Sequence, residues 1–423
     1  MKYTRISAAL AAIAIVSPPV FGDELADLKS ALAKLQAKVE QMEGQQQKSV
    51  PANVVTGGDL PGSYKLPGSN TSFKLGGYVQ LDAAYDIKGD QGRGVSLADV
   101  PLNGSAADKR RGTTTFSART SRLNFETLTN TTGGPLKTRI EFDFYTSEGS
   151  ETYTNGARPR LRHAFGQYGG WLAGQTWSNF MDVDSLPDTL EFFGPTGQVF
   201  IRQPQVRYTM AIGEGSSLAV AVENPESDAR DVGGNVTALD KGPDLTGRWT
   251  LTRDWGHFSL RGLLRDLRVE DGNGDHKASR LGWGLGVSGS FKLSTRDTLL
   301  YQLNGGQGIG RYIQDVNSAA AYNATAATLR AQRAYGGFAG AQHFWAEGLR
   351  SNLVYGFTRD HNDTGFGPIV ALNRSTSQAH ANLVWSPVKE MDVGLEYIWG
   401  QRKTEDGQKG DLDRIQASVK YNF

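Results

Sequence analysis

The sequence contains no cysteine among its 423 residues, which excludes disulfide bonds, thiol catalysis and cysteine-based metal sites. Beyond its first residues it also lacks any apolar run of 18 residues, so a transmembrane helix is excluded. Charge of either sign is not in excess, with 45 Lys and Arg against 44 Asp and Glu, and this balance does not indicate a nucleic-acid partner. Two classes remain: a large secreted all-β protein, and a membrane β-barrel whose strands alternate apolar and polar residues.

The N-terminus has the pattern of a secretory signal peptide. Lys2 and Arg5 precede an apolar stretch over residues 6–16, and residues 20–22 suit cleavage by a signal peptidase. The apolar stretch is too short to span a bilayer. We therefore assign residues 1–22 to a signal peptide, exclude them from the fold, and take export as a further argument against a nucleic-acid partner.

Residues 23–48 carry a helical pattern. Their apolar residues recur at spacings that alternate between three and four, which is typical of a coiled-coil seam: Leu25, Leu28, Leu32, Leu35, Val39 and Met42. Three heptads are too few for a stable isolated helix pair, so we expect them to assist an oligomer held by a larger interface. A single amphipathic helix lying on the barrel is the alternative. Residues 49–72, rich in Gly, Pro and Ser, are predicted to form a flexible linker.

From residue 73 to the end the hydrophobic period is two. In one example four mostly apolar residues, Leu136, Thr138, Ile140 and Phe142, alternate with Lys137, Arg139, Glu141 and Asp143. A packed protein core would not accept the unpaired charges of the second face, whereas a water-filled lumen would. About sixteen such segments occur, joined alternately by short turns and by longer polar loops such as 87–115, 178–200 and 403–411. The pattern predicts a 16-stranded antiparallel transmembrane β-barrel over residues 73–423, with both termini in the periplasm.

Aromatic residues gather at the predicted strand ends, for example Trp171, Trp255 and Trp385, as expected for girdles at the two membrane interfaces. The last three residues, ending in Phe423, resemble the terminal aromatic signal through which the barrel-assembly machinery recognises its substrates. The partners implied are therefore outer-membrane lipid and that machinery.

The loop over residues 178–200 is predicted to fold inward and constrict the barrel. Paired aromatic residues in it need a surface to pack against, which an external loop does not supply. Its candidate constriction residues are Asp182, Asp184, Asp188, Glu191, Phe192 and Phe193.

The face opposite the apolar one carries the candidate pore-lining residues. The alternation places Leu161 and Phe165 on the lipid side of their strand and directs cations into the lumen: Arg122, Lys137, Arg139, Arg160, Arg162, Arg207, Arg248, Arg261 and Arg265. Guanidinium groups offer paired donors to carboxylates and stay charged. Lumen acids such as Glu126, Glu141 and Asp143 pair with some of them, so bracing of the wall and selection of anions both remain open. An acidic loop facing a basic wall would also order dipolar solutes without rejecting cations.

Three motifs resemble sites of other chemistry, but none of them meets the requirements of that chemistry. Gly284, Gly286 and Gly289 fit a dinucleotide fingerprint, but they lie within a strand and no helix follows. A calcium-loop start at Asp271 lacks the required Gly and the terminal Glu, so a calcium site in that loop is only a minor alternative. His257 and Ser259 share a strand face without an evident third member of a catalytic group. We predict no catalytic residue, metal or cofactor.

The order of these features resembles the DcaP-like trimeric outer-membrane porins. The likeness depends on the heptads from Leu25 to Met42, the strand opening at residues 73–79 and the run at residues 174–182, and it covers nearly the whole chain. The resemblance implies a homotrimeric porin with a periplasmic coiled coil, and passive uptake of small anions such as dicarboxylates or aromatic carboxylates. A general or phosphate-preferring porin is the alternative within this class; a surface-binding adhesin or a barrel enzyme is the alternative outside it.

Overall fold

The computed structural model describes residues 29–39, 54–146, 152–231, 236–271, 274, 277–323, 325–367 and 369–423. The chain divides into two compact units: residues 1–57 with 64–69, and residues 58–63 with 70–423. In the first unit, residues 29–39 are helical, and β1 (Thr56–Gly57) pairs with β2 (Tyr64–Lys65). Leu32, Leu35 and Val39 are exposed on this helix. The predicted signal peptide, and Leu25, Leu28 and Met42 of the heptads, lie outside the described residues.

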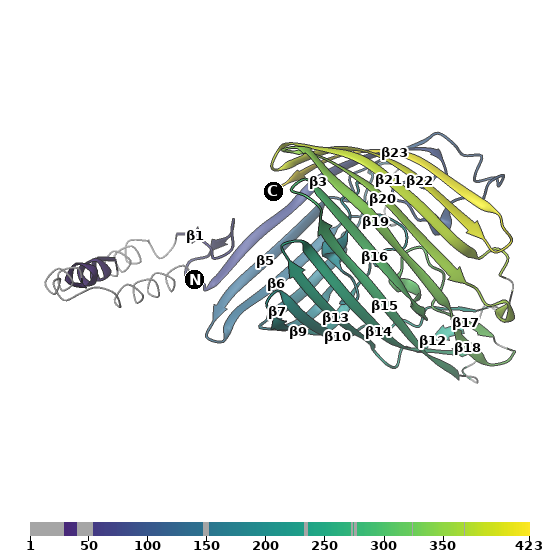
Figure 1. Ribbon diagram of the computed structural model, residues 1–423, viewed down its shortest axis with the longest axis horizontal. Helices are drawn as coiled ribbons and strands as arrows, with labels where there is room; N and C mark the ends of the chain where they lie inside the picture. Colours follow the sequence, from purple (N-terminus) through teal and green to yellow (C-terminus); the bar gives the residue numbers. More distant parts are fainter. Residues whose placement is uncertain are drawn as a thin grey trace. The chain divides into compact units, whose positions relative to one another are not determined.

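The second unit is a closed antiparallel β-barrel (Figure 1). Within the described residues sixteen strands form its wall: β3 (Thr71–Lys88), β5 (Arg122–Thr131), β6 (Gly134–Asp143), β7 (Arg160–Tyr168), β8 (Trp171–Trp177), β9 (Arg202–Gly213), β10 (Ser216–Glu223), β13 (Asp244–Arg253), β14 (Gly256–Asp271), β15 (Lys277–Lys292), β16 (Asp297–Gln307), β19 (Arg333–Ala346), β20 (Leu349–His361), β21 (Asn373–Val388), β22 (Met391–Thr404) and β23 (Lys409–Asn422). Each pairs with the next, and β23 closes on β3 through register pairs such as Ile415 with Tyr85. The predicted 16-stranded barrel is confirmed.

Alternation along the strands sets the two faces of the wall. In β14, Leu260 and Leu264 are 45% and 49% exposed, while Ser259 and Arg261, on either side of Leu260, are 0% and 1% exposed. A strand turns successive side chains to opposite faces, so an apolar exterior and a polar interior follow directly from the sequence. No described helix has the length and apolar content needed to cross a membrane.

One register shift overturns a predicted orientation. Between β6 and β7 the pairing runs from Phe142 with Leu161 to Glu141 with His163, so one extra residue interrupts β7. After this extra residue, Phe165 pairs with Arg139 of β6, whose side chain faces inward. Phe165 therefore faces inward as well. Leu161 faces outward as predicted and is 41% exposed, but the prediction that Phe165 faces lipid is wrong.

The remaining elements belong to the long connections. They are β4 (Thr113–Ser117), β11 (Ala229–Asp231), β12 (Val236–Ala238), β17 (Ala320–Asn323), β18 (Thr328–Ala331) and the 3-10 turns η2 (Leu97–Asp99), η3 (Val183–Ser185), η4 (Gly310–Tyr312) and η5 (Thr364–Phe366). β11, β17 and β18 form a separate small sheet. The loop expected at 403–411 is shorter than predicted, because β22 and β23 stay paired up to Lys403 and Lys409.

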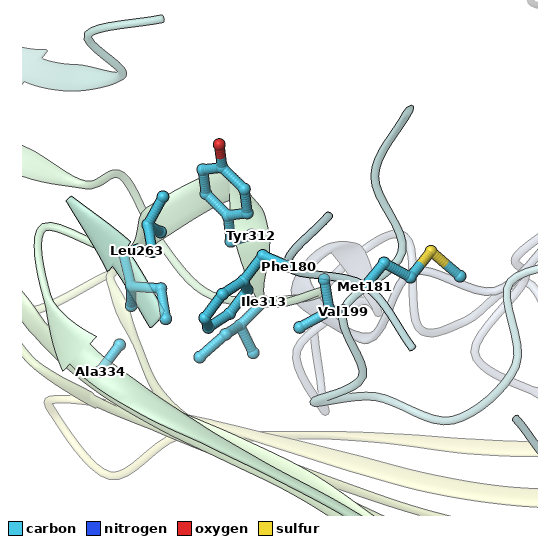
Figure 2. Close-up of a cluster of buried hydrophobic side chains, with 8 residues drawn as sticks. Phe180, Met181, Val199, Leu263, Tyr312, Ile313 and Ala334 are labelled. Carbon is cyan, nitrogen blue, oxygen red and sulfur yellow. The ribbon is translucent and has the colours of Figure 1, made fainter. Parts of the chain in front are cut away.

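A buried hydrophobic cluster joins two long connections to the inner wall (Figure 2). Phe180, Met181 and Val199 come from the connection between β8 and β9, and Ile309, Tyr312 and Ile313 from that between β16 and β19. Leu263 of β14 and Ala334 of β19 complete it from the inward faces of their strands. Apolar burial therefore places both connections inside the barrel.

Candidate functional site

Loop 178–201, which joins β8 to β9, is held by hydrogen bonds to side chains from strands around the barrel. Asp182 accepts hydrogen bonds from His257 of β14, at 2.9 Å, and from Ser288 of β15. Although burial by itself would raise the pKa of Asp182, these two hydrogen bonds lower it below its ordinary value. The carboxylate is thus an anchor between loop and wall.

Further anchors lie along the same loop. The backbone N–H of Val199 donates to Gln302 of β16 at 2.6 Å, and that of Thr196 donates to Gln378 of β21 at 2.7 Å. Glu396 of β22 accepts from the N–H groups of Leu190 and Glu191, each at 3.0 Å. Inward-facing side chains of β14, β15, β16, β21 and β22 therefore fix the path of the loop across the interior.

Three of the predicted pore arginines hold loops in place. Arg248 donates to the carbonyl of Met181 at 2.8 Å, and Arg261, 1% exposed, donates to that of Phe180 at 2.7 Å. Arg265 binds Asp244 at 3.2 Å and the carbonyl of Gly308 at 2.8 Å. Among the described residues, Lys137 and Arg207 have no ion-pair partner, and neither belongs to a cluster.

Four other predicted arginines do come together, around two buried carboxylates. Arg162 donates to Glu141 and to Asp143, both at 2.7 Å, and the side chains of these three residues are 1%, 4% and 0% exposed. Arg160 forms a paired contact with Asp143, at 2.8 and 2.7 Å. Such two-bond contacts fix the guanidinium planes as well as the charges.

The rest of this basic cluster is less tightly paired. Arg139 lies 3.1 Å from Glu126 and 2.5 Å from Glu141, whereas Arg122 reaches Glu141 only at 3.7 Å. Arg202 of β9, which sequence reasoning missed, stacks on Trp177 at 4.6 Å and has one buried nitrogen without a hydrogen-bond partner. Among the described residues the cluster comprises five guanidinium groups (Arg122, Arg139, Arg160, Arg162 and Arg202) against the three carboxylates of Glu126, Glu141 and Asp143.

Phe192 of loop 178–201 lies against this basic cluster. Its ring centre is 5.9, 5.4 and 5.6 Å from the guanidinium carbons of Arg122, Arg160 and Arg162. It also stacks on Tyr145 at 4.4 Å. The predicted need of the paired phenylalanines for a packing surface is therefore met by cations and by another ring.

A cavity of about 280 Å³ separates loop 178–201 from the opposite wall. The loop contributes residues 186–194 with Gln198 and Phe200, and the wall contributes Tyr78, Gln80, Thr120, Arg122, Arg350, Val384, Asp392, Gly394, Ser418 and Lys420. On this wall Arg350 contacts Asp188 at 2.6 Å and Asp392 at 3.4 Å, while Lys420 contacts Asp392 at 3.0 Å. Asp188 of the loop and Asp392 of β22 therefore balance Arg350 and Lys420, and the surplus of positive charge lies at the basic cluster.

The other predicted loop acids have different surroundings. Asp184 is exposed. Glu191 is buried and accepts hydrogen bonds from the N–H groups of Val95, Phe193 and Gly194 at 3.0, 2.8 and 2.9 Å. Burial outweighs these bonds and raises the pKa of Glu191 to about 7.

The glycines of the dinucleotide-like motif, and His257 of the His257–Ser259 pair, have structural roles. Gly284 and Gly286 lie in β15, where an added Cβ would come within 2.8 Å of Ile309 and 2.9 Å of Arg261. These glycines make room for the side chains that hold the inner loops. His257 anchors Asp182, and the hydroxyl of Ser259 is buried without a hydrogen-bond partner.

A closed barrel with an apolar exterior, a polar interior and a charged passage beside an internal loop defines an outer-membrane porin. The family model described as DcaP outer membrane protein matches residues 47–423, and the chain belongs to this family. It is therefore a channel of the bacterial outer membrane and not an enzyme.

Solved structures show the same fold. The outer membrane channel DcaP of Acinetobacter baumannii is 27% identical, with 88% of this chain and 100% of that chain covered and a TM-score of 0.75. OmpF of Salmonella typhi is 13% identical (84% and 98% covered, TM-score 0.55), and an anion-selective porin from Comamonas acidovorans is 13% identical (84% and 100%, TM-score 0.53). Among curated proteins no relative matches the chain.

Proposed function

We propose that this porin favours small anions, in particular dicarboxylates and aromatic carboxylates, and that loop 178–201 forms the constriction they pass. The observation that carries the proposal is the basic cluster, in which five guanidinium groups face three carboxylates beside the passage. A fixed positive surplus in a confined space with low-dielectric walls raises the local concentration of anions.

The chemistry of the passage also supports a carboxylate with apolar bulk. Arg122 and Lys420 line the cavity together with the rings of Tyr78 and Phe192. Guanidinium groups bind carboxylates through paired donors, and the rings offer apolar area to the rest of such a solute. A preference for phosphate would favour a row of lysines, whereas Lys420 is the one lysine among the described residues that line this cavity.

The experiment replaces cations whose loss leaves the buried carboxylates paired. Arg160 and Arg162 are unsuitable because they complete the hydrogen bonds of Glu141 and Asp143. Arg122→Gln with Arg202→Gln lowers the positive charge by two while the closest contacts of those acids remain. Reversal potentials in a salt gradient should move toward cations, and uptake of succinate into proteoliposomes should fall more than uptake of a neutral sugar of similar size.

The matched control carries Arg253→Gln and Arg296→Gln, which remove the same charge at short turns remote from the cluster. It should leave both readouts unchanged. Selectivity that stays constant in the double variant would contradict the proposal and would assign control to Asp188 and Asp392. Equal losses for succinate and sugar would indicate a general porin, and a stronger response with phosphate a phosphate-preferring one.

We further propose that the protein is a homotrimer, with both termini in the periplasm and residues 23–48 as a coiled coil. Two observations support this arrangement. Leu32, Leu35 and Val39 are exposed along one helix. β8 has 7 residues, fewer than the 9–11 that a tilted strand needs to cross the bilayer, so we expect a neighbouring subunit to cover this side. Sedimentation in detergent should give the mass of three chains; a monomeric mass would refute this assembly.

A further inference from the structure

A second charged cleft lies at the long-loop end of the barrel, remote from the passage described above. β16 ends at Gln307 and β19 begins at Arg333, which pairs with His361 at the end of β20, whereas β15 continues past these ends to Lys277. The shorter β16 and β19 leave a notch beside the taller β15. A cavity of about 1100 Å³ fills this notch, with η5 and the end of β18 around it.

Five arginines line the cleft: Arg280, Arg330, Arg333, Arg359 and Arg374. Within the described part of the chain, four of them have no ion-pair partner, and only Arg330 is paired, with Asp363. The other acids of the lining are Asp360, which is 4% exposed, and Glu405, which accepts a hydrogen bond from Asn362 at 2.9 Å. The cleft thus has a surplus of positive charge that the protein itself does not neutralise.

Strand register shows that three side chains of this cleft face the outside of the barrel, whereas Arg280 pairs with the buried Leu267 of β14 on the inward face. Arg333 precedes Tyr335 by two residues in β19, and Tyr335 is 45% exposed on the outward face. Arg359 pairs with Tyr335 across the β19–β20 ladder, and His361 pairs with Arg333. Side chains paired in this way share a face, so Arg333, Arg359 and His361 point away from the channel.

Aromatic side chains place the cleft at the membrane surface. Tyr335 lies 6.3 Å from Phe357 and 5.9 Å from His361, ring centre to ring centre. Trp283 of β15 is 44% exposed, two residues after the outward Leu281 of the cleft. Aromatic girdles of a membrane barrel lie at the level of the lipid head groups. Arg359 is level with Tyr335 of this girdle and Arg333 lies two residues further along its strand, so both arginines are at the height of the head groups.

We propose that this cleft binds the phosphate groups of a phosphorylated glycolipid in the outer leaflet of the outer membrane. Uncompensated arginines at head-group level attract anionic lipid, and guanidinium forks match phosphate oxygens. The apolar band below, with Leu281, Trp283 and Tyr335, would contact the acyl chains. A solute on its way into the channel is the less suitable occupant, because Arg333 and Arg359 face away from the lumen.

The experiment measures binding of diphosphoryl lipid A to the purified full-length protein in detergent, by native mass spectrometry across a concentration series. The test variant carries Arg333→Gln, Arg359→Gln and Arg374→Gln. Loss of three charge-assisted contacts should weaken binding by roughly tenfold or more. The matched control carries Lys292→Gln, Arg296→Gln and Lys389→Gln, which remove three exposed charges from the short-turn end, and should bind as the unaltered protein does.

Additional measurements separate the possible occupants. Dephosphorylated lipid A should bind weakly and equally to all three proteins, and inorganic phosphate should compete only at much higher concentration than lipid A. Unchanged single-channel conductance and reversal potential in the test variant would show a folded barrel and separate this cleft from the proposed anion selectivity. Equal lipid A binding by the test variant, or inorganic phosphate as effective as lipid A, would overturn the proposal; a shifted reversal potential would overturn it in favour of a solute site.

Discussion

Glu191 should make the attachment of loop 178–201 depend on pH. Its side chain accepts three backbone N–H bonds, one of them from Val95 in a different loop. The titratable and charged groups around it are His380, Glu396, Arg414 and the hydroxyl of Tyr145. Burial raises the pKa of Glu191 from its ordinary 4.5 to about 7, so the attached loop prefers the protonated side chain.

The sign and size follow from the linkage between protonation and folding. A carboxyl whose pKa is raised in the attached loop contributes stability that is complete below pH 4.5 and lost as the pH rises through about 7. The full difference corresponds to about 3 kcal/mol, or roughly 300-fold in the equilibrium between attached and detached loop. Asp315, whose pKa burial raises to about 6, acts in the same direction over a lower pH range.

Hydrogen exchange of peptides covering residues 186–198, corrected for intrinsic exchange, measures this equilibrium. Protection should fall between pH 5.5 and pH 8 in the unaltered protein, and Glu191→Gln should remove most of the fall. Asp184→Asn, in the same loop but exposed, is the control and should behave as the unaltered protein does. The reasoning is refuted if Glu191→Gln retains the full pH dependence, which would assign it to Asp315.

Three further predictions concern stability. Arg162→Met should lower the free energy of unfolding, measured in denaturant titrations, by about 3–5 kcal/mol, because it leaves two buried carboxylates underpaired. The control is Arg110→Met: Arg110 is 67% exposed beside Asp90, and its loss should cost at most about 1 kcal/mol in the same titrations. Gly197→Ala should lower the melting temperature more than Gly407→Ala, because both residues have positive φ but only at Gly197 would a Cβ meet backbone, at 2.2 Å from the Phe357 carbonyl. Deleting residues 23–48 should leave a trimer that dissociates at a lower temperature on gel electrophoresis; monomers alone, or an unchanged trimer, would contradict this.

The strands of the barrel could be predicted because each one repeats the alternation of apolar and polar residues several times. In β14 the outward positions Phe258, Leu260, Gly262 and Leu264 are apolar in succession, so errors at single positions do not change the assignment. Strand ends were harder: Lys403 and Lys409 are polar and suggested a loop, yet backbone pairing continues through them. Polar residues at the rim satisfy strand and loop equally, so the hydrophobic pattern cannot separate the two.

The candidate site was predictable in part. Arg122, Arg139, Arg160 and Arg162 were placed together because they lie on consecutive strands and on the polar face. Arg202 was missed because it is the first residue of β9, where alternation has not yet been established. Arg350 and Lys420 lie on strands far away in the sequence, and only closure of the barrel between β23 and β3 brings their wall beside the basic cluster.

The orientation of Phe165 shows why side-chain direction needs more than alternation. One extra residue in β7 moves every later side chain of that strand to the other face, so His163 turns inward between Trp177 and Phe165. This interruption lets two consecutive residues, Arg162 and His163, both face the interior. There Arg162 donates to Glu141 and Asp143, and His163 lies 3.8 Å from Glu141. Burial of two carboxylates requires enough donors around them. The register shift is therefore part of how the wall holds its basic cluster, and it depends on contacts between strands that a linear pattern does not contain.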